Sequence, residues 1–326
     1  MVKMVEYLKI KNFKGIKELE IKDFSPVNIF VGKANTGKTS VLEALSFLYE
    51  TPTNRTIANC LEVRGLKANY DRNLPLRTQR NFEKDAFESL FYDINIDNHI
   101  DIATNFRSLE LEFSKKTITI LDDKIEERQS LKPKYLPKNI SESVNLVYSN
   151  HKAELLNNIY SEIADDNRKK EKFVDYLKKF DKDFYECELK NNSLYIRMHS
   201  LSKAINIKQM GQGVIFYATV CALLVRGDKT IIIDEIENGF HYSALDMVLN
   251  IIFDKAKNEN IQFFISTHSL EFLSKANIIL DSGKFGGNLV SVFNIYKQKN
   301  GDTNYIKYSQ NEFIKQLDLE NEIRSF

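Results

Sequence analysis

The pattern of apolar and polar positions at the start of the chain predicts strands followed by a helix. The stretch VEYLKIKNFKGIKELEI predicts two strands that meet at a turn at Lys14-Gly15, and VNIFVG (27–32) predicts a third, buried strand that ends at a glycine. Apolar residues then recur at helical spacing from 41 to 48, and Pro52 is expected to end this helix.

The middle of the chain contains alternating segments and strongly charged ones. SLELEFSKKTITI (108–120) alternates in the manner of a β-hairpin. From about 122 to 183 the charged residues favour helices, and the lack of sustained heptads excludes a long coiled coil. The apolar run VIFYATVCALLV (214–225) predicts a buried helix, because it is too short to span a membrane.

Strands and helices alternate in the last third of the chain. TIIIDE (230–235) and IQFFIST (261–267) are apolar runs typical of buried strands, and HYSALDMVLNIIFDKAK between them is expected to be a helix. This order predicts a right-handed βαβ unit with parallel strands. Asn300-Gly301 predicts a hairpin turn, and a last helix is expected after it.

Net charge, cysteine spacing and the N-terminal segment bear on the partners and the compartment of the protein. The 326-residue chain has 46 basic and 45 acidic side chains, so its net charge of +1 gives no overall signal for nucleic acid. Cys60, Cys187 and Cys221 show no paired or metal-type spacing, which is typical of a reducing compartment. The start MVKMVEYLKI lacks the apolar core of a signal peptide. We expect a cytoplasmic protein without a membrane partner.

Positive charge is concentrated between residues 64 and 84. Six basic residues there accompany two acidic ones, Asp71 and Glu83, and this local excess could meet phosphates of DNA or RNA, or an acidic protein. A solvated loop explains the same composition and is the favoured interpretation, so nucleic acid stays an open partner. The basic residues are Arg64, Lys67, Arg72, Arg77, Arg80 and Lys84.

The stretch VGKANTGKTS (31–40) carries the strongest chemical signal. It fits the pattern G-x-x-x-x-G-K-[ST] and lies between a predicted buried strand and a predicted helix, which disfavours a simple turn. Backbone N–H groups and the helix N-terminus would bind phosphate oxygens, Lys38 would neutralise the β and γ phosphates, and the Thr39 hydroxyl would bind magnesium. The predicted nucleotide-binding residues here are Gly32, Lys33, Ala34, Asn35, Thr36, Gly37, Lys38, Thr39 and Ser40.

Two strand ends in the last third supply further candidate residues. Asp234 follows the strand TIII at the carboxyl edge of a parallel sheet, where ligands bind, and can hold a metal ion through water. Glu235 can accept a proton from the attacking water as a general base. His268 follows the next strand, where an imidazole could contact the γ phosphate. The alternative is that these polar residues only solubilise the ends of the strands. The phosphate loop elsewhere in the chain disfavours this alternative.

These segments together resemble a known group of ATPases. VGKANTGKTSVLEAL, IIIDEIENGFH and ISTHSLEFL, with the N-terminal LKIKNFKGIKELEI, resemble the ABC-type ATPases of the SMC, RecF and OLD group, and most of all compact OLD-like proteins without a coiled coil. The resemblance covers nearly the whole chain. It implies an α/β P-loop fold of the ABC-ATPase type, with a mixed central sheet, an antiparallel β subdomain and a helical lobe.

The resemblance also implies ligands and roles. ATP and Mg²⁺ are the expected ligands, and each ATP of a homodimer would lie between the phosphate loop of one chain and the signature motif of the other. Lys38, Glu235 and His268 are the implied catalytic residues, as the phosphate-loop lysine, the base and the switch histidine. Thr39 and Asp234 are the implied metal ligands.

The signature motif departs from the common pattern of the group. KQMGQGV (208–214) precedes an apolar helix, and its glycines would let the backbone approach the γ phosphate of the partner chain. The usual serine is missing, and a glycine turn before a buried helix is the alternative. Asn238 and Gly239 fall where a segment usually crosses the dimer interface. The predicted signature residues are Gly211, Gln212 and Gly213.

The sequence predicts one ATPase head over residues 1–326. Its nucleotide-binding core would comprise 1–60 and 200–295, with a β and helical lobe inserted at 61–199 and a hairpin and helix at 296–326. The favoured function is a dimerising ATPase that senses and regulates a separate effector protein, in anti-phage or toxin-type defence as the resemblance implies.

Three other functions remain as alternatives. A RecF-like ATPase of DNA maintenance is the main one. A transporter subunit is disfavoured by the missing signature serine and by the continuation IENGFH after the carboxylates. A self-contained nuclease is disfavoured because only 58 residues follow His268 and they contain no Asp-x-Asp pair.

Overall fold

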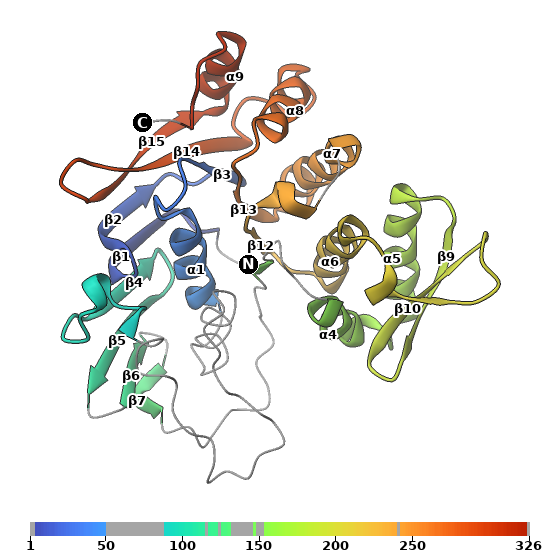
Figure 1. Cartoon of the computed structure of the whole chain (residues 1–326), viewed down its shortest axis with the longest axis horizontal. Helices are drawn as coiled ribbons and strands as arrows, with labels where there is room; N and C mark the ends of the chain where they lie inside the picture. The colour runs from blue at the N-terminus through green and yellow to red at the C-terminus, as the bar shows by residue number, and fades with distance from the viewer. Residues whose placement is uncertain are drawn as a thin grey trace.

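The fold is organised around one six-stranded sheet of mixed direction. The computed structural model describes residues 4–49, 88–114, 117–122, 125–131, 146–147, 153–239 and 242–324. The strand order in the central sheet is β15-β14-β3-β13-β12-β8 (Figure 1). Its strands are β3 (Val27–Val31), β8 (Leu146–Val147), β12 (Thr230–Ile233), β13 (Gln262–Ser266), β14 (Val290–Lys297) and β15 (Thr303–Ser309).

Strand direction in this sheet agrees with the sequence analysis. β14, β3, β13, β12 and β8 are parallel, and β15 pairs with β14 in the antiparallel sense as the second strand of the predicted tail hairpin. The parallel pairing of β12 with β13 confirms the strand directions of the predicted βαβ unit. Because parallel strands end at the same edge, the carboxyl ends of β3, β12 and β13 meet there.

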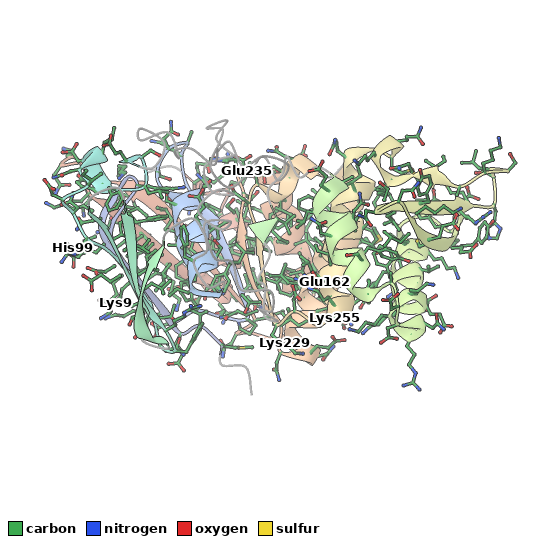
Figure 2. The ribbon with its side chains drawn as sticks, turned by 90° about the horizontal axis from the view of Figure 1, so that it is seen from below. Lys9, His99, Glu162, Lys229, Glu235 and Lys255 are labelled. Atoms are coloured by element: carbon green, nitrogen blue, oxygen red, sulfur yellow. The ribbon has the colours of Figure 1, made fainter. Side chains whose placement is uncertain are left out.

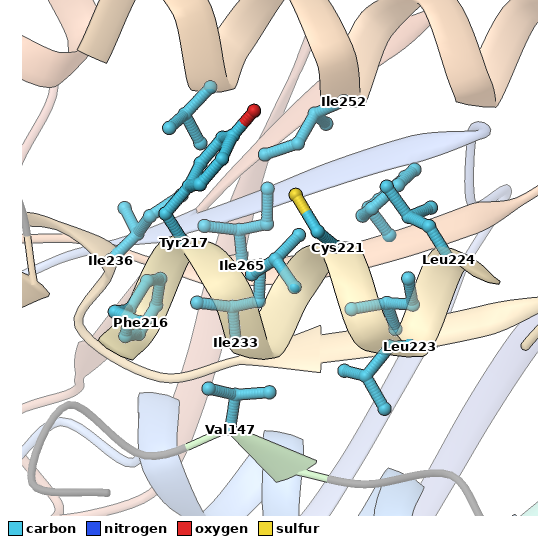
Figure 3. Close-up of a cluster of buried hydrophobic side chains, with 14 of the residues drawn as sticks. Val147, Phe216, Tyr217, Cys221, Leu223, Leu224, Ile233, Ile236, Ile252 and Ile265 are labelled. Atoms are coloured by element: carbon cyan, nitrogen blue, oxygen red, sulfur yellow. The ribbon is translucent and has the colours of Figure 1, made fainter. Parts of the chain in front are cut away.

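Helices cover one face of the central sheet in a row. Alternate strand residues such as Ile231, Ile233 and Ile265 share a buried cluster with α6, α7 and α8. Cys221 of α6 points into this cluster (Figure 3), and burial raises the pKa of its thiol to about 12. The helices on this side are α6 (Gln212–Arg226), α7 (Tyr242–Glu259), α8 (Leu270–Asp281) and α9 (Gln310–Asp318). The predicted helix over 214–225 is confirmed as α6.

The opposite face of the central sheet is covered by α1 and a second sheet. Phe30, Ile232 and Phe264 share a cluster with α1 (Lys38–Tyr49) and with strands of an antiparallel sheet ordered β2-β1-β4-β5-β6-β7. Both predicted hairpins of the first 120 residues are confirmed there. The strands are β1 (Tyr7–Phe13), β2 (Ile16–Lys22), β4 (Ile100–Thr104), β5 (Ser108–Ser114), β6 (Thr117–Asp122) and β7 (Ile125–Leu131). Lys9 and His99 lie on its outer side (Figure 2).

A small lobe packs against the outer side of α6. It consists of α4 (Ala153–Ile163), α5 (Asn167–Phe180), β9 (Phe184–Lys190), β10 (Ser193–Met198) and β11 (Ile205–Asn206) (Figure 1). The prediction of helices from 122 to 183 is right for α4 and α5. It is wrong for 125–131, where β7 pairs with β6, and for 146–147, where β8 pairs with β12. A polar run such as EERQS (126–130) does not distinguish a helix surface from a strand, and here pairing with the neighbouring β6 decided the outcome.

Two further points concern membrane-spanning helices and the basic cluster. No helix among the described residues is long and apolar enough to cross a membrane. The basic cluster between residues 64 and 84, together with Pro52 and Cys60, lies outside the described residues.

Helix α1 is fixed by two buried cations from the antiparallel sheet. Lys14, in the turn between β1 and β2, forms an ion pair with Glu43 of α1, and their side chains are 3% and 0% exposed. Arg107, just before β5, donates from Nη1 to the carbonyl oxygen of Leu48 at 2.7 Å, near the C-terminus of α1. Both contacts fix α1 on the antiparallel sheet, and the Arg107 contact is favourable also because it places a cation at a helix C-terminus.

Breaking the Lys14–Glu43 pair on one side is expected to destabilise the fold strongly. Glu43→Gln leaves a buried ammonium group without its counter-charge, at a cost of about 3–5 kcal/mol in the free energy of unfolding. The double change Lys14→Met with Glu43→Leu should recover most of this loss, because it removes both charges. Urea denaturation followed by circular dichroism measures each value.

The matched control for this prediction is Glu20→Gln. Glu20 is 39% exposed and pairs with Lys9 and Lys22 on the same sheet, so its loss is expected to leave the denaturation midpoint nearly unchanged. A Glu43→Gln protein as stable as Glu20→Gln would contradict the structural role of the buried pair.

Candidate functional site

A glycine-containing loop joins β3 to α1 at the carboxyl edge of the central sheet. Residue 31 ends β3 and residue 38 begins α1, as the phosphate-loop pattern predicts. Gly32 has φ of 135°, and a Cβ atom there would lie 2.2 Å from the carbonyl oxygen of Ile295 on β14. Gly37 has φ of 112° and Asn35 has φ of 61°. The two glycines are therefore required by the backbone path of the loop.

Lys38 lies over its own loop. Its Nζ donates to the carbonyl oxygens of Gly32 at 2.9 Å and Lys33 at 2.8 Å, and the residue is 5% exposed. Burial lowers the pKa of Lys38 to about 8, although the carboxylates of Asp234 and Glu235 act in the opposite direction. A bound polyphosphate would offer this ammonium group stronger acceptors than two carbonyl oxygens.

The remaining loop residues divide into a buried and an exposed set. Thr36 and Ser40 are each 7% exposed, and the Thr36 hydroxyl donates to the carbonyl oxygen of Lys33 at 3.0 Å. Lys33, Ala34 and Asn35 are exposed at the loop tip.

Thr39 and Asp234 meet across the sheet edge. The Thr39 hydroxyl lies 3.1 Å from Oδ2 and 3.3 Å from Oδ1 of Asp234, although 195 residues separate them. Asp234 follows β12 and is 7% exposed, and burial raises the pKa of its carboxyl group to about 6. Hydroxyl and carboxylate oxygens are the ligands that Mg²⁺ prefers, so this pair fits a magnesium site.

Ser266, at the end of β13, orders the acidic pair. It is fully buried, its hydroxyl donates to Oδ1 of Asp234 at 2.5 Å, and it accepts from the backbone N–H of Glu235 at 2.8 Å. Glu235 has φ of 50°, a left-handed conformation that costs about 1–3 kcal/mol in a residue with a side chain. Asn238 Nδ2 donates to Glu235 Oε2 at 2.7 Å. Asn238 therefore holds the carboxylate of Glu235, and Ser266 holds its backbone (Figure 2 labels Glu235).

His268 is held by its backbone on both sides. Its N–H donates to Oε1 of Glu237 at 2.5 Å, and its carbonyl oxygen accepts from Nη1 of Arg324 at 2.7 Å. Glu237 Oε2 also accepts from the Thr267 hydroxyl at 2.8 Å. Burial and the nearby charge of Lys38 lower the pKa of His268, which favours the neutral imidazole.

The structure brings together most of the predicted site and adds residues to it. Lys38, Thr39, Asp234, Glu235 and His268 gather at one edge, since they follow β3, β12 and β13. The sequence analysis did not predict three residues at this site. Two of them lie within two positions of a predicted site residue, which could have indicated them. Ser266 precedes the predicted His268, and Glu237 lies two residues after Glu235. The third, Arg324, had no local signal.

The predicted signature segment lies apart from the phosphate loop. Gly211 is the exposed N-cap of α6 without a side-chain hydrogen bond, and Gln212 and Gly213 form the first turn. α6 covers the face of the sheet opposite α1, so this segment and the phosphate loop precede helices on opposite faces of the sheet. The C-terminus of α6 lies near the start of β12, because Gly227 ends the helix three residues before β12 begins, so the first turn of α6 points toward the carboxyl edge.

A phosphate loop after β3 and an acidic pair after a parallel strand, on a central sheet of this order, define a P-loop ATPase of the ABC type. The family model described as "AAA domain, putative AbiEii toxin, Type IV TA system" matches residues 77–274, more than half of the chain. The chain belongs to this family. The matched range contains the signature segment, the acidic pair and His268, and it begins after the phosphate loop.

Similar proteins and structures agree with this class. A Helicobacter pylori protein named "ATP/GTP phosphatase" is 25% identical over 334 residues, covering 83% of this chain and 86% of that protein. RecF from Lactobacillus acidophilus is 47% identical over 53 residues, which are 16% of this chain and 14% of RecF.

Solved structures of SMC heads share the fold. An SMC head bound to the C-winged helix domain of ScpA has a TM-score of 0.59 at 12% identity, covering 96% of this chain and all of that one. An SMC head bound to the C-terminal domain of ScpA, derived from Pyrococcus furiosus, has a TM-score of 0.55 at 10% identity, covering 97% and 99%. The predicted α/β fold of the ABC-ATPase type is thereby confirmed.

The lowered pKa of Lys38 predicts that nucleotide affinity falls in alkaline solution. Phosphate groups would raise this pKa from about 8, so binding takes up a proton once free Lys38 has lost it. We expect nearly constant affinity for Mg-ATP between about pH 7 and pH 8, where Asp234 is ionised and Lys38 protonated, and a loss that approaches about tenfold per pH unit above this range. Isothermal titration calorimetry on Glu235→Gln protein, which limits turnover, measures this profile.

Lys38→Arg is the control for the alkaline loss of affinity. Its guanidinium group stays charged over the same range, so binding should be weaker but independent of pH. The same slope in Lys38→Arg would show that another group causes the loss.

Proposed function

We infer that this chain binds and hydrolyses ATP, pairs with a second copy around the nucleotide, and in this way regulates a separate effector protein. The contact between Thr39 and Asp234, with Glu235 next to it, carries this proposal, because it combines the phosphate loop with an acidic site. We extend the proposal to residues 1–326 as one ATPase head. The core is 1–60 and 200–295, the inserted lobe is 61–199, and the terminal part is 296–326.

The proposed reaction begins with binding of the triphosphate. Backbone N–H groups of the loop and the N-terminus of α1 would bind phosphate oxygens, and Lys38 would leave its two carbonyl acceptors for the β and γ phosphates. Thr39 and Asp234 would hold Mg²⁺, whose positive charge offsets the charge on the phosphate oxygens. Ionised Asp234 is needed for this, and binding of the metal would lower its raised pKa.

Glu235 is the proposed general base. Its carboxylate would accept a proton from the water that attacks the γ phosphate, while Asn238 and Ser266 keep it oriented. His268 would contact the γ phosphate as a neutral imidazole, in agreement with its lowered pKa. The strained backbone of Glu235 supports a functional position, since such strain is concentrated at active sites.

Pairing of two chains is proposed from the place of the signature segment. Gly211 and Gln212 are exposed and Gly213 is half-buried, and the segment begins a helix on the face of the sheet opposite α1, so it would complete the site of a second copy. The helix N-terminus there carries partial positive charge that suits a γ phosphate. Loss of that phosphate would remove the contact shared by the two chains, which couples hydrolysis to separation.

The biological role is proposed from the family. The family description names a toxin and a TA system, which supports action with a separate protein in a defence response against phage in the cytoplasm. A second candidate function is a DNA-maintenance ATPase, favoured by the similarity to RecF over 53 residues.

Glu235→Gln should separate binding from hydrolysis. The amide cannot accept the proton of the attacking water, so we expect kcat to fall by about a hundredfold or more with ATP affinity retained. Lys38→Ala should abolish binding itself, because it removes the charge that meets the phosphates. Phosphate release and fluorescent-nucleotide binding measure both. Unchanged turnover in Glu235→Gln would remove Glu235 from the role of base.

His268→Ala should lower turnover with little effect on affinity. The imidazole is proposed to act on the γ phosphate during hydrolysis, so kcat should fall by roughly tenfold or more at a nearly constant KM. A loss of affinity alone would make His268 a binding residue.

Capture from the native cell distinguishes the two candidate functions. Tagged Glu235→Gln protein with Mg-ATP should retain one protein that the Lys38→Ala control does not retain, since only the first can stay in the ATP state. Nuclease-sensitive DNA held in place of that protein would favour DNA maintenance and contradict the effector proposal.

A further inference from the structure

The segment after α9 returns to the carboxyl edge of the central sheet. α9 ends at Asp318, and Glu320 turns the chain with φ of 56°. Its N–H donates to the carbonyl oxygen of Leu317 at 2.9 Å, and that of Asn321 to Gln316 at 3.0 Å. Ile323 is then 1% exposed and belongs to the buried cluster shared with α6, α7 and α8. The following residue is thereby placed beside the nucleotide site.

Asn294 joins this segment to the base of the phosphate loop. It lies on β14 opposite Val31, is fully buried, and donates from Nδ2 to the carbonyl oxygen of Ile323 at 2.8 Å. Its Oδ1 would lie 3.2 Å from a Cβ atom at Gly32, so the amide fills the space directly behind the first loop glycine. A shift of Ile323 would be felt at Gly32, because close-packed groups transmit displacement.

Arg324 joins the same segment to His268. Nη1 donates to the His268 carbonyl oxygen at 2.7 Å, while Nε and Nη2 donate to the two oxygens of Glu322 at 2.7 and 2.5 Å. The guanidinium group is 27% exposed and lowers the pKa of Glu322 to about 2, so the pair stays charged at neutral pH. The planar fork thereby fixes the direction in which the third nitrogen points.

We propose that residues 322–324 form a strap that fixes His268 relative to the phosphate loop, with Arg324 as a positioning residue for the histidine. Glu237 holds the N–H side of the same residue, so removing Arg324 frees one of its two backbone contacts. A binding partner that displaces the strap would therefore slow hydrolysis without touching the nucleotide. The inference rests on the role of His268 in the proposed function, and its structural part can be tested without ATP.

Arg324→Ala tests the strap first by hydrogen exchange without nucleotide. The segment 266–270 should exchange roughly tenfold faster than in the wild type, because local opening no longer breaks the contact with Arg324. Arg324→Lys keeps a donor and should reverse part of the change. Arg197→Ala is the matched control, since Arg197 is 36% exposed, pairs with Glu186 and Glu188 in the lobe, and should leave this segment unchanged. Unchanged exchange in Arg324→Ala overturns the strap.

Steady-state kinetics tests the consequence for hydrolysis. Arg324→Ala should lower kcat by about tenfold with KM nearly constant, as expected when a reacting group is misplaced and binding is retained. The double variant with His268→Ala should be no slower than His268→Ala alone, because Arg324 acts through that side chain. Losses that multiply in the double variant overturn the positioning role.

The two proposals fail in different ways. A wild-type chain without Lys38-dependent ATP turnover overturns the proposed function, and the exchange experiment still decides the strap. Normal wild-type turnover with an unaffected Arg324→Ala overturns the strap alone.

Discussion

The hydrogen bond between Thr39 and Asp234 forms because parallel strands end at the same edge of a sheet. β3 and β12 flank β13 in the central sheet, so the residues that follow the three strands are neighbours despite their distance in sequence. Ser266 at the end of the middle strand holds the acidic pair after β12, because it contacts both Asp234 and the backbone of Glu235. The site is therefore a property of strand order.

Buried contacts around α1 fix the position of the helix that begins at this edge. The helix lies between two sheets, with Lys14 paired to Glu43 on one side and Arg107 at its C-terminal end. Its first turn carries Lys38 and Thr39, so the antiparallel sheet indirectly positions the phosphate loop. Burial also disfavours the charged forms inside the site, because it raises the pKa of Asp234 and lowers the pKa of Lys38. Bound ligands of opposite charge would restore both charged forms.

The sequence predicted those parts of the structure that are specified locally. The pattern G-x-x-x-x-G-K-[ST] from Gly32 to Thr39 is specific to phosphate loops, and the apolar run before Asp234 is typical of a buried strand. The sequence therefore located both the loop and this strand correctly. β7 was missed because its polar run EERQS (126–130) lacks the alternation of a half-buried strand and fits a helix surface equally well. Ser266 and Arg324 could not be assigned roles, because each role comes from a partner distant in sequence. Local patterns identify motifs, while the contacts that orient them arise from tertiary packing.

A structure of Glu235→Gln protein with Mg-ATP would decide whether one edge of the sheet binds Mg-ATP between two chains, as proposed. We expect a two-fold pair in which Lys38 contacts the phosphates, Thr39 and Asp234 hold the metal, and Gly211 to Gly213 of the second chain approach the γ phosphate. A nucleotide bound elsewhere, or bound at the loop of a single chain with the signature segment exposed, would contradict it.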